Sequence, residues 1–364
     1  MSYITALATA SPPHRHSQQQ IADFMIRAMK LDDTEARRLR ALYRATGIDF
    51  RHSVLADYGR PADFSFYANT DNLEPFPSTR QRLEIYREHA LKLSRQAAES
   101  CLEKVDRQDI TNLIVVSCTG MYAPGLDIDL VKALGLNSHV QRVCINFMGC
   151  YAAFNAIRLA DTICRAEPHA RVLIVCVELC SIHFQKEATE DNLLANALFA
   201  DGAAAVLVQN RPQPGLNLKP RSFFCDLAPA GEQHMAWTVG DLGFEMKLSS
   251  YVPDVIRQGI GQLTHRLLEQ INLARNQIAY YAIHPGGKKI IESIEAELGL
   301  TAFDTQHSYD VLRQYGNMSS PTVLFVLQRV SRQLNGVDDG KNILSFAFGP
   351  GLTLESMVLE IENH

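Results

Sequence analysis

The sequence predicts an α/β protein whose sheets are largely buried. Short apolar runs bounded by small residues are typical of strands covered on both faces, and they occur at 113–116, 142–147, 172–177, 203–208, 278–283 and 342–346. Helical patterns lie between these runs, and such alternation favours an α/β architecture. The 364 residues, 46% of them apolar, can form one large core or two fused ones. We expect two similar α/β halves, residues 1–215 and 216–364, that meet near 210–225.

The N-terminal half is expected to carry long helices. Ser17 is a candidate cap for the first of them, and four arginines crowd its second part. The strand at 142–147 runs directly into Met148-Gly149-Cys150, where a helix of small residues begins. The helices expected in this half are 17–46, 80–105, 127–134 and the one that starts at Cys150.

The segment 209–250, which spans the junction of the two halves, is predicted to be rich in loops and contains the only tryptophan, Trp237. Beyond it the pattern is regular again, and glycine-rich turns follow two of the strands. The elements expected there are helices at 253–271, from about 288 to 298 and within 314–334, and strands at 278–283 and 342–346.

Composition and charge argue against several classes of protein. The net charge is −5, without the basic surplus of a nucleic-acid-binding protein. No window approaches eighteen uninterrupted apolar residues, so no transmembrane helix is expected, and the N-terminus lacks the features of a secretory signal. None of the eight cysteines has C-x-x-C spacing. We therefore expect a cytoplasmic protein with free thiols, no metal and no bound cofactor.

Cys150 stands apart from the other cysteines because it follows Gly149 at a strand-to-helix turn. The dipole and free N–H groups at a helix N-terminus favour a thiolate, so the pKa of the thiol is expected to fall there. The turn is also the geometry that a nucleophile requires. A buried, inert cysteine is the alternative and carries equal weight for this residue alone.

Two further residues lie at the ends of elements. His284 ends an apolar strand and could exchange protons with the thiol, or it could merely bond to a loop carbonyl. Asn317 precedes a helix, so it could cap that helix or donate to a substrate carbonyl. A Cys–His–Asn trio serves both papain-like proteases and enzymes that condense thioesters. The residues around Cys150 do not fit the protease pattern.

Five segments together resemble type III polyketide synthases, the family of chalcone synthase: GCYAAFNAIRLA, ALFADGAAAVLV, IHPGGKKIIE, YGNMSSPTVLFVL and FAFGPGLTLE. They occur in the family's order between about residues 110 and 360. The resemblance implies a thiolase fold, with two αβαβα halves in a five-layered core, and a homodimer. It also implies Cys150 as the acyl-carrying nucleophile, with His284 and Asn317 promoting decarboxylation of malonyl-CoA and stabilising the enolate.

The same resemblance assigns residues of the pocket. Phe199 matches the gatekeeper between the coenzyme A tunnel and the cavity, and Met246 takes the second gatekeeper position, where it departs from the family. Ala123 replaces a methionine that reaches the partner subunit's cavity, and Gly240 matches the glycine on the cavity floor. The other pocket positions are Cys118, Thr119, Cys180, His183 and Ser319.

Coenzyme A binding is assigned to Arg38, with Arg44 as a neighbour that could substitute. A solvated helix face is an equally weighted alternative for these arginines. Acyl-CoA and malonyl-CoA are thus the expected substrates.

The resemblance implies iterative condensation of malonyl-CoA onto an acyl-CoA starter, followed by closure to a pyrone or a phenolic ring. Small Ala123 and non-aromatic Met246 favour a fatty acyl starter and an alkylpyrone or alkylresorcinol product. The alternatives are a small-starter or malonyl-only synthase making phloroglucinol- or tetrahydroxynaphthalene-type products, a ketoacyl-ACP synthase III-like enzyme and, remotely, a cysteine hydrolase. A deep apolar tunnel beyond Cys118 would support the fatty acyl starter, and a short closed pocket would oppose it.

Overall fold

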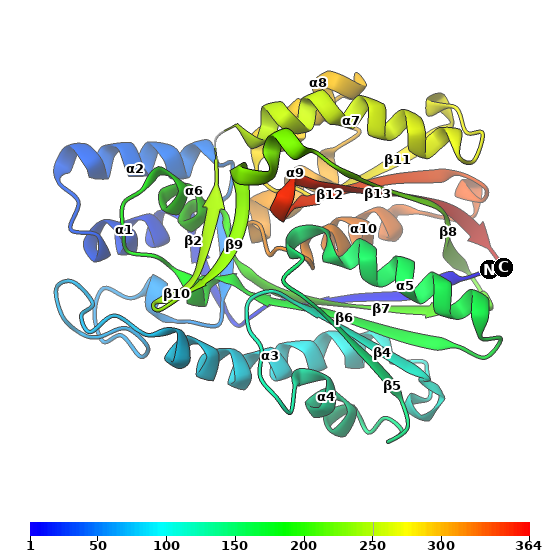
Figure 1. The fold of residues 1–364 in the computed structure, drawn as a ribbon, viewed down its shortest axis with the longest axis horizontal. Helices are drawn as coiled ribbons and strands as arrows, with labels where there is room; N and C mark the ends of the chain where they lie inside the picture. The colour runs from blue at the N-terminus through cyan, green and yellow to red at the C-terminus, as the bar shows by residue number, and fades with distance from the viewer. Residues whose placement is uncertain (250) are drawn as a thin grey trace.

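The computed structural model describes residues 1–249 and 251–364 (Figure 1). The helices are α1 (Gln18–Ala28), α2 (Asp33–Ala45), α3 (Thr79–Cys101), α4 (Leu126–Leu134), α5 (Ala152–Ala166), α6 (Glu190–Leu198), α7 (Val252–Glu269), α8 (Lys288–Leu298), α9 (Gln306–Tyr315) and α10 (Thr322–Gln333). The strands are β1 (Tyr3–Ala10), β2 (His14–Ser17), β3 (Phe50–Ser53), β4 (Asn112–Ser117), β5 (Gln141–Asn146), β6 (Arg171–Leu179), β7 (Asp201–Gln209), β8 (Leu216–Leu227), β9 (Met235–Gly240), β10 (Gly243–Leu248), β11 (Ile278–Ile283), β12 (Asn342–Gly349) and β13 (Thr353–Asn363).

The main sheet repeats one pairing pattern in its two halves. Its order is β11-β12-β13-β8-β1-β7-β6-β4-β5. From β1 outward, the pairs β1–β7 and β7–β6 are antiparallel and the next pair, β6–β4, is parallel. From β8 outward, the pairs β8–β13 and β13–β12 are antiparallel and β12–β11 is parallel. The halves join at a single pairing, Ile4 with Leu218. The division between residues 215 and 216 stays a prediction.

Five layers result from this arrangement (Figure 1). Helices α3 and α4 cover one half-sheet, α5 and α10 lie between the two halves, and α7 and α8 cover the other. Strand β4 explains the layering, since Leu113 and Val115 pack toward α3 while Ile114 and Val116 pack toward α5. Alternate residues of a strand face opposite sides, so a fully apolar strand fits between two helical layers.

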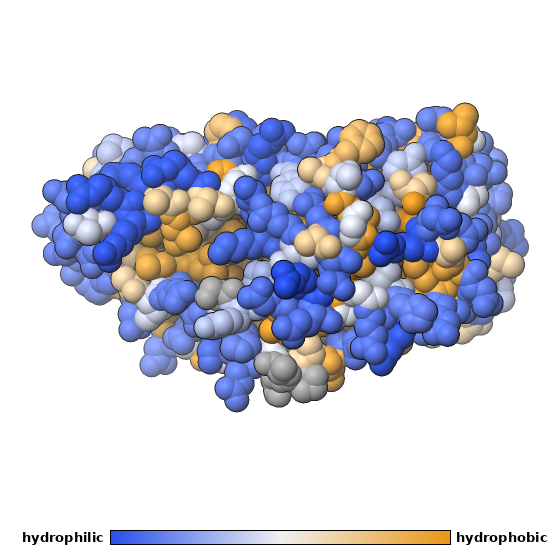
Figure 2. Space-filling view, turned by 90° about the horizontal axis from the view of Figure 1, so that it is seen from above, coloured by the Kyte–Doolittle hydropathy of each residue, from blue (hydrophilic) through white to orange (hydrophobic). Residues whose placement is uncertain are grey.

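Smaller elements gather at one end of the layered core. There α1, α2 and α6 lie near the β2–β3 pair and the β9–β10 hairpin (Figure 1). Ser17 caps α1 as expected, because its hydroxyl accepts from Gln20 N and the Gln20 side chain accepts from Ser17 N. Seen from above, the surface is largely polar, with an apolar hollow at this same end (Figure 2). No helix of the described residues is both long and apolar enough to span a membrane.

The structure corrects several expectations about single elements. Strand β5 was expected to be buried, but it lies at the sheet edge, and five of its six residues are exposed. The segment 209–250 contains three strands, β8, β9 and β10, where loops were expected. Strands β1 and β13 and helix α9 were not foreseen. The strands expected at 113–116, 172–177, 203–208 and 278–283 are confirmed, as are the helices expected within 17–46, 80–105, 127–134 and 253–271.

Candidate active site

Cys150, His284 and Asn317 line one pocket between the two halves of the core. Cys150 lies in a 3-10 turn, Gly149–Tyr151, that leads into α5. His284 directly follows β11, and Asn317 follows α9. Their exposed fractions are 6%, 1% and 2%. Three segments that are far apart in the sequence therefore present nucleophilic, basic and amide groups to the same buried space.

The turn before Cys150 requires glycine. Gly149 has a φ of 72°, a backbone conformation that other residues adopt only at a cost. A Cβ on Gly149 would also lie 2.4 Å from Cδ of Pro350. The glycine-rich turn after β12 thus packs directly against the turn that carries Cys150.

The amide of Asn317 is held in one orientation. Its Oδ1 accepts a hydrogen bond from Ser319 N at 2.8 Å, which places the NH₂ group on the other side. Nδ2 donates to Gly286 O at 3.3 Å. Because an amide nitrogen has two hydrogens, one N–H remains for a substrate oxygen. Ser319 itself has a φ of 57°, unusual for a residue with a side chain.

The ionisation of Cys150 differs from the sequence-based expectation. Burial raises the pKa of the Cys150 thiol to about 12, whereas the sequence led us to expect a lowered pKa at the helix N-terminus. Burial also lowers the pKa of His284 to about 3. The thiol points toward Asn317 Oδ1 at 3.9 Å, and neither ring nitrogen of His284 has a protein partner among the described residues. Each isolated charge is costly here, whereas a thiolate and an imidazolium formed together would compensate one another.

One wall of the pocket is a hydrogen-bonded polar cluster. Cys118 Sγ lies 3.6 Å from Ser319 Oγ, and Thr119 Oγ1 donates to Glu178 Oε2 at 2.8 Å. Glu178 also accepts from Cys118 N and from Ser320 Oγ. Burial raises the pKa of Glu178 to about 7 despite these donors. Glu178 was not among the predicted site residues, although a carboxylate directly after the buried apolar run 172–177 was a signal.

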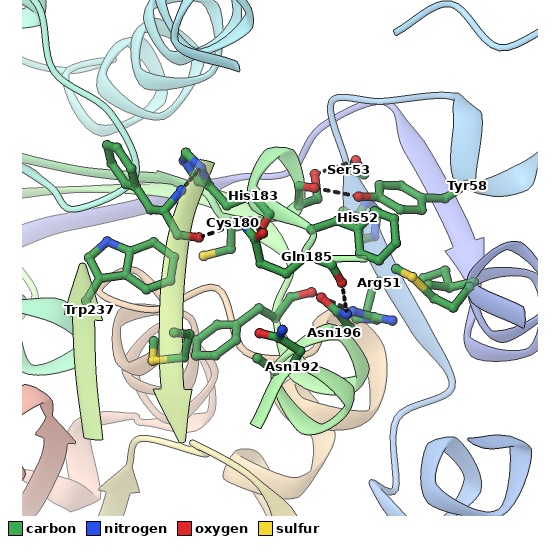
Figure 3. Close-up of a pocket in the computed structure, with 18 residues that line it drawn as sticks. Arg51, His52, Ser53, Tyr58, Cys180, His183, Gln185, Asn192, Asn196 and Trp237 are labelled. Atoms are coloured by element: carbon green, nitrogen blue, oxygen red, sulfur yellow. Dashed lines mark hydrogen bonds between the residues drawn. The ribbon is translucent and has the colours of Figure 1, made fainter. Parts of the chain in front are cut away.

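A second pocket adjoins the first and is drawn in Figure 3. Cys180, Phe199, Met246 and Trp237 line both pockets, so they form the boundary between them. His183 lines only the second pocket. Its Nε2 lies 2.7 Å from Thr119 O and its Nδ1 accepts from Phe244 N at 3.0 Å, which fixes a neutral ring stacked on Phe244.

Gly240 does not lie on the cavity floor. It ends β9 at the turn of the β9–β10 hairpin, and a Cβ there would meet Glu245 and not the pocket. Trp237 fills the pocket instead, with its Nε1 donating to Cys118 O at 2.6 Å. The expectation failed because the hairpin was taken for a loop, which left the register of its residues undefined.

Three other predicted residues lie outside both pockets. Ala123 is exposed near the start of α4, and Arg38 and Arg44 are exposed on α2. Among the described residues, no group of three or more His, Cys, Asp and Glu side chains could hold a metal ion.

Five layers with a buried cysteine, histidine and asparagine between the two halves define the class: a thiolase-fold enzyme. The comparison with known structures agrees. Polyketide synthase PKS-I of the brown alga Ectocarpus siliculosus superposes with a TM-score of 0.92 at 31% identity, covering 99% of this chain and 98% of that one. The C-terminal type III polyketide synthase domain of Steely1 from Dictyostelium gives a TM-score of 0.89 at 29% identity, covering 99% of each chain.

Sequence comparison identifies the family. Residues 1–212 match the N-terminal domain of chalcone and stilbene synthases, and residues 222–362 match the C-terminal domain. The chain is 33% identical over 369 residues to the alpha-pyrone synthesis polyketide synthase-like protein Pks18 of Mycobacterium tuberculosis, covering 99% of this chain and 91% of the relative. The chain belongs to the chalcone and stilbene synthase family, and it is a type III polyketide synthase with an acyl-transferring, condensing activity.

Proposed function

We propose that this enzyme condenses malonyl-CoA onto a short acyl-CoA starter through a thioester on Cys150 and closes the product as an α-pyrone. The observation that carries the catalytic part is the convergence of Cys150, His284 and Asn317 on one buried pocket, with one Asn317 N–H free for a substrate oxygen. The starter and the ring are the finer part of the proposal and rest on other observations.

The proposed reaction uses the three residues in sequence. His284 takes the proton of Cys150, Sγ attacks the thioester carbonyl of the starter, and the coenzyme A thiol leaves with that proton. Malonyl-CoA then loses carbon dioxide, and the electron pair of the broken bond forms an enolate. Hydrogen bonds from His284 and Asn317 to the enolate oxygen stabilise it. The enolate carbon attacks the acyl carbon, and the Cys150 thiolate leaves, ready for the next round.

A short starter is supported by the wall around Cys118. Trp237 is bonded to Cys118 O and packs edge-on against His183 and Phe244. Beyond Cys118 and Thr119, the buried ring of Tyr86 fills the space next to Gly120. Trp237 and Tyr86 occupy this direction, which supports a short starter over the fatty acyl starter expected from the sequence. The α-pyrone product is supported by the function after which the Pks18 relatives are named.

A panel of starters tests this proposal. Purified enzyme is given malonyl-CoA with acetyl-, butyryl-, hexanoyl-, lauroyl- or palmitoyl-CoA, and products are identified by mass spectrometry. We expect pyrones from the short starters. Trp237→Ala should raise kcat/KM for lauroyl-CoA relative to butyryl-CoA by about tenfold or more, since it empties the wall beyond Cys118. Trp237→Phe, which keeps an aromatic ring, is the matched control.

Other outcomes of the panel would change the proposal in defined ways. Preference of the wild-type enzyme for palmitoyl-CoA would refute the short starter and leave the condensing chemistry standing. Turnover with malonyl carried by an acyl carrier protein, but not with malonyl-CoA, would point to the ketoacyl-ACP synthase III-like alternative. Free acid without condensation would point to a hydrolase.

Coenzyme A is proposed to bind along the end of α2. Arg44 is exposed in the last turn of α2, and Arg38 is exposed in the middle of that helix. Gly47, just beyond α2, lies against the Lys288 side chain at the start of α8. Cations from two elements near the same turn would suit the phosphates of coenzyme A. Arg44→Glu should therefore raise KM for malonyl-CoA while changing kcat little, and an unchanged KM would exclude Arg44 from the site.

A further inference from the structure

Arg51, on β3, is a buried cation that bonds to no carboxylate. It is 5% exposed, and its two hydrogen bonds go to neutral acceptors, Gln18 Oε1 at 2.9 Å and Phe199 O at 2.7 Å. Its third nitrogen, Nη2, has no partner among the described residues. Asp201 attracts this charge without a hydrogen bond to it, and neighbouring polar groups must supply the rest of the compensation.

A further part of the compensation comes from the C-terminal end of α6. The last carbonyls of a helix have no partner within the helix and carry its negative dipole end. In α6 these are the carbonyls of the segment 196–199. Each one accepts a hydrogen bond from elsewhere: Asn196 O from Tyr43 Oη at 3.1 Å, Ala197 O from Gln18 Nε2 at 2.8 Å, Leu198 O from Asn317 N at 2.9 Å and Phe199 O from Arg51 Nη1. Figure 3 shows Arg51 beside Asn196 at this helix end.

The same helix end carries two residues of the candidate active site. Phe199 caps α6 and pairs with Asn317 in a parallel bridge, with Ala200 N donating to Asn317 O at 2.8 Å. The Arg51 stem lies against Gly316, where a Cβ would be 2.8 Å from Arg51 Cγ and 2.9 Å from Leu198 O. Arg51 therefore contacts both segments at the point where they meet.

We propose that Arg51 is a positioning residue that, by closing the C-terminal end of α6, fixes Phe199 and the Asn317 amide in their working geometry. Arg51 acts through these residues and is not proposed to contact substrate or Cys150. The inference rests on the proposed roles of Asn317 and Phe199. A planar guanidinium suits this place because it donates to Gln18 and Phe199 at once, which a lysine ammonium on a flexible stem does not reproduce.

The test separates positioning from folding. Arg51→Met keeps an apolar stem against Gly316 but removes the cation and both hydrogen bonds. Active enzyme is counted by titrating Cys150 with iodoacetamide and identifying its peptide by mass spectrometry. Malonyl-CoA decarboxylation is then expressed per titrated Cys150. We expect kcat to fall about tenfold or more while KM changes little, since small displacements of catalytic groups have effects of that size. Arg51→Lys should give an intermediate loss.

Tyr43→Phe is the matched control, since it removes one hydrogen bond to the same helix end and leaves the cation in place. We expect its kcat per titrated Cys150 to stay within about threefold of the wild type. Wild-type kcat per titrated thiol in both Arg51 variants, or losses equal to that of Tyr43→Phe, would overturn the proposal. If Arg51→Met does not fold, Arg51→Lys and Gln18→Met take its place. A lower kcat per titrated Cys150 in these variants supports the proposal, and a wild-type kcat overturns it. An inactive wild type would instead count against the proposed function.

Discussion

At the scale of single residues, the site is governed by burial. Cys150 and His284 are each held neutral by desolvation, which raises the pKa of the thiol and lowers that of the imidazole. A reactive thiolate then depends on transfer of its proton to His284, because only the two charges together are compensated. We therefore propose that Cys150 is activated by proton transfer to His284 and not by the helix end alone.

Alkylation of Cys150 tests this dependence. In His284→Gln the thiol keeps a raised pKa, so its thiolate fraction should increase about tenfold per pH unit up to that pKa. At pH 7 we expect the variant to react with iodoacetamide about tenfold more slowly than wild type, or slower still. The Cys150 peptide is followed by mass spectrometry because Cys144 and Cys225 are exposed, so we expect them to be alkylated as well. Identical rates and pH profiles in both proteins would contradict the account.

His183 makes stability depend on pH. Burial lowers its pKa from 6.5 to about 3. Above pH 6.5 the ring is neutral in both folded and unfolded chains. As the pH falls below 6.5, the unfolded chain binds a proton that the folded chain rejects, so stability is lost toward acid, by roughly 2 kcal/mol at pH 5. Glutamine can make the same two hydrogen bonds without titrating.

When the pH is lowered from 8 to 5, the free energy of unfolding of the wild type should fall by roughly 2 kcal/mol more than that of His183→Gln. Urea unfolding at several pH values measures this shift. Parallel stability curves for the two proteins would show that His183 is not the titrating group.

At the scale of elements, the turn before α5 shows how a strand end, a glycine and a neighbouring loop position one thiol. Gly149→Ala should be inactive, because the added Cβ would strain a positive φ and collide with Pro350. Gly135→Ala is the control: Gly135, which caps α4 outside both pockets, also has a positive φ, 66°, but a Cβ added there would meet no atom within 4 Å. It should cost about 1 kcal/mol of stability and leave kcat unchanged. Equal activity of the two variants would contradict the role given to the turn.

The elements also show what a sequence can and cannot predict. Strands such as β4 and β6, apolar on both faces, were predicted because a continuous apolar run can be recognised from the local sequence alone. Strand β8 was missed because it includes Pro220 and several polar residues, and its pairing with β13 and β1 depends on distant segments. Cys150, His284 and Asn317 were singled out from turns at element ends, and the structure brings them to one pocket. Trp237 and Arg51 were not, since only tertiary packing brings them to the pockets.

At the scale of the whole molecule, the described sheet is open at β5. An edge strand presents unpaired backbone groups that readily pair with another chain. The exposed residues of β5 include Val143, 41% exposed, and Cys144. These features support the homodimer, which stays a prediction, as does the cytoplasmic location.

Val143→Arg places a charge on this strand and tests the dimer. We expect the wild type to have the mass of a dimer by light scattering and the variant to shift toward the mass of one chain, about 40.6 kDa. Leu227→Arg, at an exposed residue far from β5 at the end of β8, is the control and should not change the mass. A variant as dimeric as the wild type would exclude β5 from the interface.

In the proposed mechanism, the two halves of the molecule serve one covalent step, the transfer of an acyl group to Cys150. Cys150 comes from the N-terminal half, and His284 and Asn317 come from the C-terminal half. Mass spectrometry of the enzyme mixed with butyryl-CoA alone measures that step most directly. The account predicts a butyryl adduct on the Cys150 peptide, chased to product by malonyl-CoA and absent in Cys150→Ala. An adduct on another residue such as Cys118, or full-length product from Cys150→Ala, would contradict it.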